Sequence, residues 1–338
     1  SQVKAISGAT GQEFDDLTAK AQEMGATTKF TATESAEAFN YMAMAGWKPQ
    51  QMIDGISGIM SLAAASGEDL GTTSDIVTDA LTAFGLQAGD AGHFADVLAQ
   101  ASANANTNVS MLGESFKYVA PVAGAMNYSV EDTSLALGLM ANASIKGSMA
   151  GTALKTSLAN MAAPTDSMAA AMDKYGISLT DSEGNMKSLR GVIDNLRGSL
   201  GGLSETEQTA AASTIFGKEA MAGMLAIINA SEEDYNKLST AIGNSKDAAE
   251  GMADTMLDNL KGSFTLMQSA IEGTENAFGK RLSPYLRGIA GGITDMMPEI
   301  TDGINAVMDV VDDKIAGVKR KITDMTSSDE WKNADLFG

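Results

Sequence analysis

Apolar residues recur at helical spacing through the first 245 residues, in short runs divided by glycine or by polar breaks. Thr31 and Glu34 have capping-box spacing, and the helix that they open is predicted to run through Ala45 and stop at Gly46. Similar apolar stripes follow at Met52, Ile56, Ile59 and Ala63, at Val77, Leu81 and Phe84, and at Phe94, Val97, Leu98 and Ala101. Because isolated helices of ~10–15 residues are marginal in water, these helices must bury their stripes against one another. We therefore predict an all-α fold, with a multi-helix domain over residues 1–245.

Polar and proline-containing segments mark further helix ends. Residues 102–109 indicate a polar loop, Ser110 the cap of the next helix, and Pro121 a kink or an end of that helix. Three serines with an acidic residue three positions on predict more helix starts: Ser129 with Asp132, Ser204 with Glu207, and Ser231 with Asp234.

Residues 144–154 form the tightest break in this pattern. A helix beginning at Ser129 precedes them, and a helix that stops before Pro164 follows. Gly147 and Gly151 lack a Cβ, so either can adopt positive φ or let another backbone approach closely. The sequence therefore predicts a small-residue corner at which two helices turn back on each other.

The apolar period changes from helix to strand between residues 177 and 188. The segments 177–179 and 186–188 alternate apolar and polar residues around the turn 181–185. This pattern predicts a small β-hairpin. A two-stranded ribbon is marginal alone, so we expect it to lie on the helices.

Longer stripes begin after residue 245. Apolar residues predict one long helix over 246–284, followed by a stripe over 285–325 with a period of about 3.55 residues, between the straight-helix and heptad values. We interpret 285–325 as an amphipathic coiled-coil helix and 326–338 as a polar tail. The coiled coil is expected to join copies of this chain, and its mixed Ile and Val permit a trimer without selecting one strongly. The alternative is that this helix folds back on residues 1–245.

Composition restricts the function. The chain has 338 residues and a formal net charge of −20, and so acidic a surface disfavours stable nucleic-acid binding. The absence of Cys excludes disulfides, thiolate metal sites and a Cys nucleophile, and it fits a reducing assembly compartment. The 22 Met residues indicate a deformable core suited to remodelling, or simply gap-filling side chains.

No group of residues with catalytic spacing stands out. His93 is the single histidine, so we expect neither a His-based catalytic triad nor a two-His metal site within one chain. We expect a surface or satisfied histidine instead. Residues 181–185 lack the length of a calcium loop, and Lys155-Thr156 lack the glycine of a phosphate loop. The carboxylate pairs 232–233 and 312–313 are interpreted as solvated faces. We predict no catalytic, cofactor-binding or metal-binding residue, no cofactor, and a protein that is not an enzyme.

The run 145–154, closing at 163–165, resembles the most typical segment of the phage tail tape measure (minor tail protein) core family. Further blocks match this family in order along the chain, at residues 28–34, 81–86, 118–123 and 215–220. Together the blocks span roughly residues 1 to 290, and an ordered series is more specific than any one block. None of the blocks is a catalytic or ligand-binding motif, so the resemblance implies a structural role and no active site.

Membership of this family would imply a protein of the virion tail lumen, made in the host cytoplasm, whose length sets tail length while the tube assembles. It would leave before DNA ejection, act in several copies, commonly three, and contact the tail tube protein, tail-tip or baseplate proteins and an assembly chaperone. The chain departs from a complete family member in length, because even fully helical it spans only about 500 Å.

The rival hypothesis is a membrane-active helical protein, either pore-forming or like a secreted toxin. The missing leader pattern counts against it, as does the longest apolar run, about nine residues around 220–228, where a span needs ~20. The abrupt start without Met is expected of an excised fragment.

Overall fold

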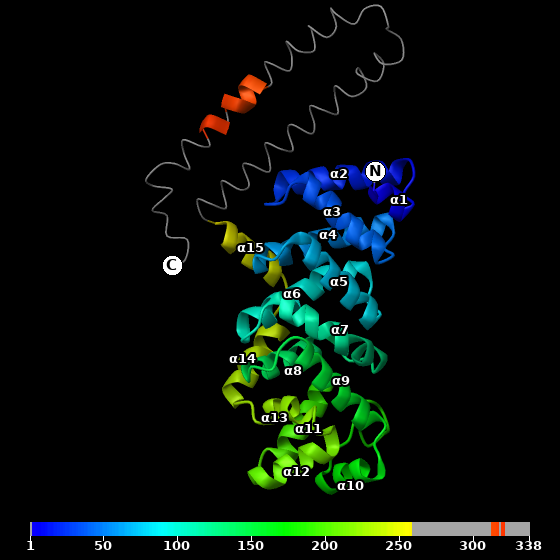
Figure 1. Ribbon diagram of the computed structural model, residues 1–338, viewed down its shortest axis with the longest axis vertical. Helices are drawn as coiled ribbons and strands as arrows, with labels where there is room; N and C mark the ends of the chain where they lie inside the picture. The colour runs from blue at the N-terminus through cyan, green and yellow to red at the C-terminus, as the bar shows by residue number, and fades with distance from the viewer. Residues whose placement is uncertain (1, 259–311, 318, 322–338) are drawn as a thin grey trace, which may run out of the picture.

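The computed structural model describes residues 2–258, 312–317 and 319–321, and helices make up nearly all of its regular structure (Figure 1). The helices and their bounds are α1 Gln2–Ser7, α2 Gln12–Thr27, α3 Ala32–Met44, α4 Pro49–Ser66, α5 Leu70–Phe84, the short 3-10 helix η1 Ala88–Asp90, α6 Ala91–Asn104, α7 Val109–Ala125, α8 Val130–Asn142, α9 Ser148–Ala162, α10 Asp166–Tyr175, α11 Leu189–Leu200, α12 Glu205–Phe216, α13 Met221–Ile228, α14 Glu232–Gly243 and α15 Ala248–Leu257. The all-α prediction is confirmed.

Most of the helices form two adjoining columns. In one column α3, α5, α7 and α9 each pack on the next, and in the other α2, α4, α6 and α8 do the same. Consecutive helices also pack across the columns, as α4 does on α5 and α8 on α9. Each helix therefore buries its apolar stripe against neighbours on two sides, as expected for helices too short to be stable alone. We call α2–α9 the stack.

The last two helices run back along the stack. Beyond α9, helices α10–α13 close its far end, and the chain then reverses (Figure 1). α14 packs on α8 and α6, and α15 packs on α6 and α4. We call α14 and α15 together the return arm. Since α2 also packs on α4, the described chain enters and leaves the stack at the same end.

Aromatic side chains fix the centre of the core. Phe116 of α7 lies 5.7 Å from Phe84 in an edge-on arrangement and 5.6 Å from Phe94, measured between ring centroids. Phe39, Phe94, Phe116 and Phe216 are among the largest side chains that are fully buried. Rings of this size give definite shape to a core that also contains many flexible Met side chains.

Local capping signals position several helices as predicted. At α3 the Thr31 hydroxyl accepts from the Glu34 amide at 3.1 Å, and the Glu34 carboxylate accepts from the Thr31 amide at 2.7 Å, so the full capping box forms. Ser204 and Ser231 cap α12 and α14. Gly46 takes positive φ directly after the predicted end at Ala45.

Some predicted helix ends are wrong. Asn108, and not Ser110, caps α7, because its side chain accepts from the Met111 amide at 2.8 Å. Pro121 lies inside α7, which continues to Ala125, so this proline does not end the helix.

The predicted hairpin is reduced to one antiparallel bridge, between Thr180 and Met186. The Asp181 carboxylate accepts from the amides of Glu183 and Asn185, both at 2.9 Å, and this local turn takes up backbone donors that a longer ladder would need. Ser188 then caps α11, which leaves too few residues for a second strand. No strand forms within the ranges that the structure describes.

Most of the predicted C-terminal helices lie outside the described residues. The long helix predicted over 246–284 is described only to residue 258, as α15 and a bend. Of the coiled coil predicted over 285–325, residues 312–317 and 319–321 are described, and they are helical. The predicted polar tail 326–338 lies wholly outside. The division at residue 245 stays a prediction, although α15, just beyond it, packs on the stack.

Candidate functional site: a glycine corner and a polar network

The corner predicted at residues 144–154 joins α8 to α9 and is built around α7. Gly147 precedes α9 with φ +57°, a conformation that favours glycine. The Ser115 hydroxyl of α7 donates to the Gly147 carbonyl at 2.8 Å. A Cβ at Gly151 would overlap the Ser115 carbonyl oxygen, so only glycine lets α9 approach α7 this closely. The predicted small-residue corner is confirmed, and its partner is a third helix that the sequence did not indicate.

A shallow groove lies beside this corner, between α9 and the start of α13. Its volume is about 350 Å³. Two of the sequence blocks that carry the family resemblance meet in it, since its lining includes Ile145, Met149 and Ala153 from the first block and Glu219 and Ala220 from the second. Met149 is 66 % exposed. The groove offers apolar contact area, and of the residues considered above for chemistry its lining includes Thr156.

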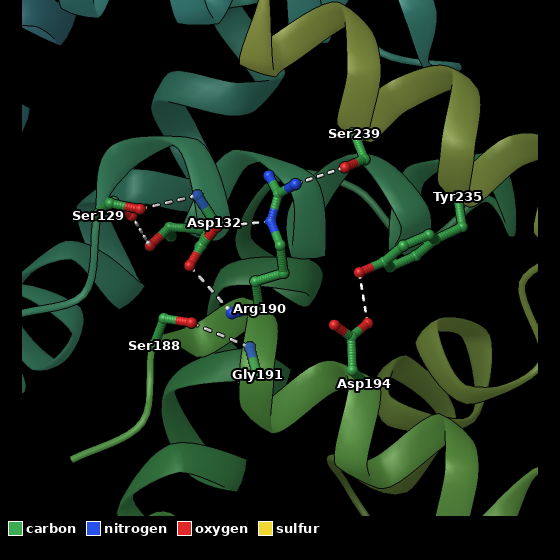
Figure 2. A network of polar contacts seen from close by, with 9 residues as sticks. Ser129, Asp132, Ser188, Arg190, Gly191, Asp194, Tyr235 and Ser239 are labelled. Carbon is green, nitrogen blue, oxygen red and sulfur yellow. Dashed lines mark hydrogen bonds and ion pairs between the residues drawn. The ribbon is translucent and has the colours of Figure 1, made fainter. Parts of the chain in front are cut away.

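A polar network joins α8, α11 and α14 (Figure 2). Asp132 is 8 % exposed, and its carboxylate accepts from the Arg190 amide at 3.0 Å and from Arg190 Nε at 3.1 Å. The same guanidinium donates from Nη1 to Ser239 Oγ of α14. Asp132 thus makes only half of the predicted capping box: its amide donates to Ser129 Oγ, while its carboxylate turns to Arg190.

A second arginine of α11 holds the start of the return arm. Arg197 donates to the carbonyls of Ile227 and Ala230 at 3.0 and 2.8 Å, and its Nη2 pairs with Glu232 at 2.7 Å. Its guanidinium carbon also lies 4.7 Å from the ring centroid of Tyr235. Bidentate and stacked contacts of this kind suit arginine better than lysine.

Tyr235 completes the network from the arm side. Its hydroxyl donates to the Asp194 carboxylate (Figure 2). Burial, followed by the hydrogen bond to this carboxylate, raises the pKa of the Tyr235 phenol. The phenol therefore stays neutral and keeps donating at ordinary pH.

Sequence reasoning missed these network residues for a clear reason. Asp132 and Arg190 are 58 positions apart, and Arg197 and Glu232 are 35 apart. Only the folded topology brings such pairs together. The one local signal was the spacing of Arg190 and Arg197, seven residues apart, which places both on one face of a helix.

The residues considered for chemistry lie apart from one another. His93 Nε2 is 2.7 Å from Glu131 Oε1 in an exposed pair. Lys155 Nζ lies 6.0 Å from the ring centroid of Tyr118. Glu232 of the pair 232–233 binds Arg197. Within the described ranges no group of three or more His, Asp or Glu side chains could hold a metal ion.

The turn at Asp181 is satisfied by its own backbone. Hydrogen bonds from Asn185, and others from Glu183 and Gly184, lower the pKa of the Asp181 carboxyl group. The charged Asp181 carboxylate is therefore explained by its role in holding a tight turn.

Of the helices described, none combines the length and apolar character that crossing a bilayer requires.

Comparison with known proteins agrees with the resemblance of the sequence blocks. Residues 18–217 match the family described as phage-related minor tail protein. The chain is 40 % identical over 297 residues to the tape measure protein of Pneumococcus phage Dp-1, covering 88 % of this chain and 26 % of that protein. It is 27 % identical over 277 residues to the probable tape measure protein of Escherichia phage P2, covering 80 % of this chain and 34 % of that one. No solved structure matches significantly.

The chain thus spans between a quarter and about a third of the length of these two relatives. The matched region, 18–217, includes all of the stack from Thr18 of α2 onward, the glycine corner and Arg190 and Arg197 of the network. The match therefore covers the described helices from most of α2 through α12. The chain belongs to the phage-related minor tail protein family.

Proposed function

We propose that this chain is a structural segment of a tail tape measure that occupies the lumen of the tail tube. In this role its length contributes to tail length while tube subunits assemble around it, and it leaves the tube before DNA passes. Assembly takes place in the host cytoplasm, and the segment does not act as an enzyme. The observation that carries the proposal is the 40 % identity to the Dp-1 tape measure protein over 88 % of the chain.

The charge of the chain supports a place in the lumen. With a net charge of −20, the protein is repelled by the DNA that must follow it through the same channel. A tape that does not bind nucleic acid stably leaves the path free. The proposed partners are therefore proteins: the tail tube protein, tail-tip or baseplate proteins, an assembly chaperone and further copies of this chain, with a trimer among the possible assemblies.

The packing of the described residues also supports a structural role. Buried residues of successive helices form one apolar core, and the closest helix contacts use glycine, as at Gly151. The polar contacts of Arg190 and Arg197 hold helices together. The specific contacts of this body thus maintain its shape, as expected of a structural protein.

Tail length is the direct test. In a phage that carries this gene, an in-frame deletion of residues 2–258 should give measurably shorter tails in electron micrographs. If the segment contributes as extended helix, the loss is about 385 Å at 1.5 Å per residue, and if it contributes as the compact stack, the loss is smaller. An insertion of equal length should lengthen the tails. Tails of unchanged length in both mutants would contradict the proposal.

A further inference from the structure

Tension between the two ends of the described body reaches the return arm and α2 before the rest of the stack. α15 packs on α4 and α6, and α2 packs on α4, so both ends of the described body lie at one end of the stack, on opposite sides of it (Figure 1). When two points at the same end of a stack are pulled apart, contacts break one after another from that end. They are not loaded together, as they would be if the points lay at opposite ends. The topology therefore favours peeling.

The arm buries fewer large apolar side chains than the helices that it covers. Among the side chains that the structure describes, its fully buried large residues are Leu238 and Ile242 of α14, and α15 adds the small Ala249 and Ala253 and the partly buried Met252. By contrast, α4, on which α15 packs, alone buries Met52, Ile56, Ile59, Met60 and Leu62 together with smaller residues. Since apolar burial dominates the stability of such contacts, the arm is held less firmly than the stack.

Polar contacts supply much of what fastens the arm. Arg190 reaches Ser239 while it is held by Asp132, and Arg197 holds Ile227, Ala230 and Glu232. These contacts fix the start and the middle of α14.

The start of α15 is fastened from the stack. Asp96 of α6 accepts from the amide of Asp247 at 2.8 Å and from the amide of Ala249 at 2.9 Å. α15 has no side-chain cap of its own, so a residue 151 positions earlier in the chain satisfies the free amides at its first turn.

We propose that the return arm is a strap that peels from the stack before any stack helix opens, and that Arg190, Arg197 and Asp96 are its fasteners. The strap divides the protein into a unit that opens under load and a unit that stays folded. This inference goes beyond the proposed function, because it concerns the order of opening wherever the chain works.

Force spectroscopy on the full chain tests the order. The chain has no native Cys, so Thr10→Cys and Asp258→Cys, both at exposed positions, give unique attachment points for handles. Pulling between them should show a first release of roughly 90 Å, in one or two steps, which is the extended length of residues 232–258. A single rupture of the whole body would overturn the proposal.

A second geometry controls for the first. Handles at Thr10→Cys and Asp173→Cys, at opposite ends of the body, leave the arm outside the loaded span. The early release of roughly 90 Å should then be lost, and the first opening should need more force. An early release of the same length in this geometry would assign that release to the N-terminal helices and would contradict the strap.

Substitutions test the fasteners. Arg190→Gln and Asp96→Asn should each lower the force of the first release by a measurable margin and leave later steps unchanged. Arg190→Lys, which keeps the charge and loses the fork, should give an intermediate force. Matched controls are Lys237→Gln, on the exposed face of α14, and Asp173→Asn, on α10, and both should leave the first step as it is. An unchanged first step in the fastener variants would overturn their assignment. All of these readouts use the purified chain, so they are independent of the tail-length test.

Discussion

The stack and the return arm are made from the same kind of short helix, yet they are held in different ways. Within the stack, α7 and α9 approach until Gly151 meets the backbone of α7, and aromatic rings fill the centre around Phe116. In the arm, Leu238 lies over Gly138 of α8 and α15 packs small residues on α4 and α6, while hydrogen bonds and ion pairs to Asp96, Arg190 and Arg197 add to these contacts. The comparison indicates how a difference in the kind of contact could divide one helical body into a firmly packed part and the releasable strap that we propose.

The largest effect should come from the centre of the stack. Phe116→Ala removes a ring that is 1 % exposed and packs on two other rings, so we expect a loss of about 3–5 kcal/mol in the free energy of unfolding. Urea denaturation followed by circular dichroism measures this loss. Phe14→Ala, at the partly buried N-terminal edge, is the matched control and should cost clearly less. Equal losses of unfolding free energy in the two variants would mean that the core is not centred on Phe116.

Glycine substitutions should separate the two kinds of contact. Gly151→Ala forces a Cβ against a backbone carbonyl that cannot move cheaply, and should cost about 1–3 kcal/mol. Gly138→Ala meets the flexible end of Leu238 most closely and Ala105 Cβ at 3.3 Å, so repacking and better helix propensity should bring its net cost below about 1 kcal/mol. Gly198→Ala, which meets nothing within 4 Å, should stabilise the protein. Thermal melts rank the three variants, and a Gly138→Ala cost above that of Gly151→Ala would reverse the comparison.

Two tyrosines offer a matched pair. The Tyr128 hydroxyl is buried in the stack with no partner among the described residues, whereas the Tyr235 hydroxyl of the arm donates to Asp194. Tyr128→Phe should therefore raise the free energy of unfolding by about 1 kcal/mol, and Tyr235→Phe should lower it by a similar amount. Denaturation midpoints at pH 7 decide the signs. A loss of stability in Tyr128→Phe would reveal a hydrogen bond that the described contacts do not include.

Tyr128 also predicts how the stability of the protein depends on pH. Burial raises the pKa of Tyr128 to about 12. The folded state holds the phenolic proton more tightly than the unfolded state, so this contribution to stability is complete below pH 10 and is lost as the pH rises through about 12. The wild type should lose up to about 2 kcal/mol more than Tyr128→Phe over this window. Parallel stability curves for the two proteins would contradict the raised pKa.

The smallest effect is expected at His93. Its pair with Glu131 is exposed, so His93→Ala should change the free energy of unfolding by less than about 0.5 kcal/mol. A urea titration at pH 6 and at pH 8 checks this expectation. A larger loss at either pH would give the single histidine a structural role that its exposed position does not suggest.

Local patterns predicted those features that local contacts build. The Thr31 and Glu34 box, the Ser231 cap and the corner at Gly147 each depend on residues within a few positions, and each formed as expected. The hairpin failed because the Asp181 side chain bound the backbone inside its own turn. Pro121, predicted to kink or end its helix, does not end it, because the packing of α7 outweighs the one backbone donor that proline lacks.

Features that depend on topology could not be predicted in this way. Nothing near Asp96 in the sequence indicates that it caps a helix beginning 152 positions later, and nothing near Gly151 indicates that its contact is Ser115. The reversal of α14 and α15 along the stack depends on the arrangement of columns that only the whole fold defines. The polar network was missed for the same reason.

Native-state hydrogen exchange measured by mass spectrometry tests the difference between stack and arm most directly. Peptides from α14 and α15 should exchange together through an opening of lower free energy than peptides from α5, α7 and α9, and Arg190→Gln should speed exchange in the arm while leaving α7 unchanged. If arm and stack exchange through one common opening, and Arg190→Gln shifts both equally, the two regions form a single cooperative unit and the distinction between them is wrong.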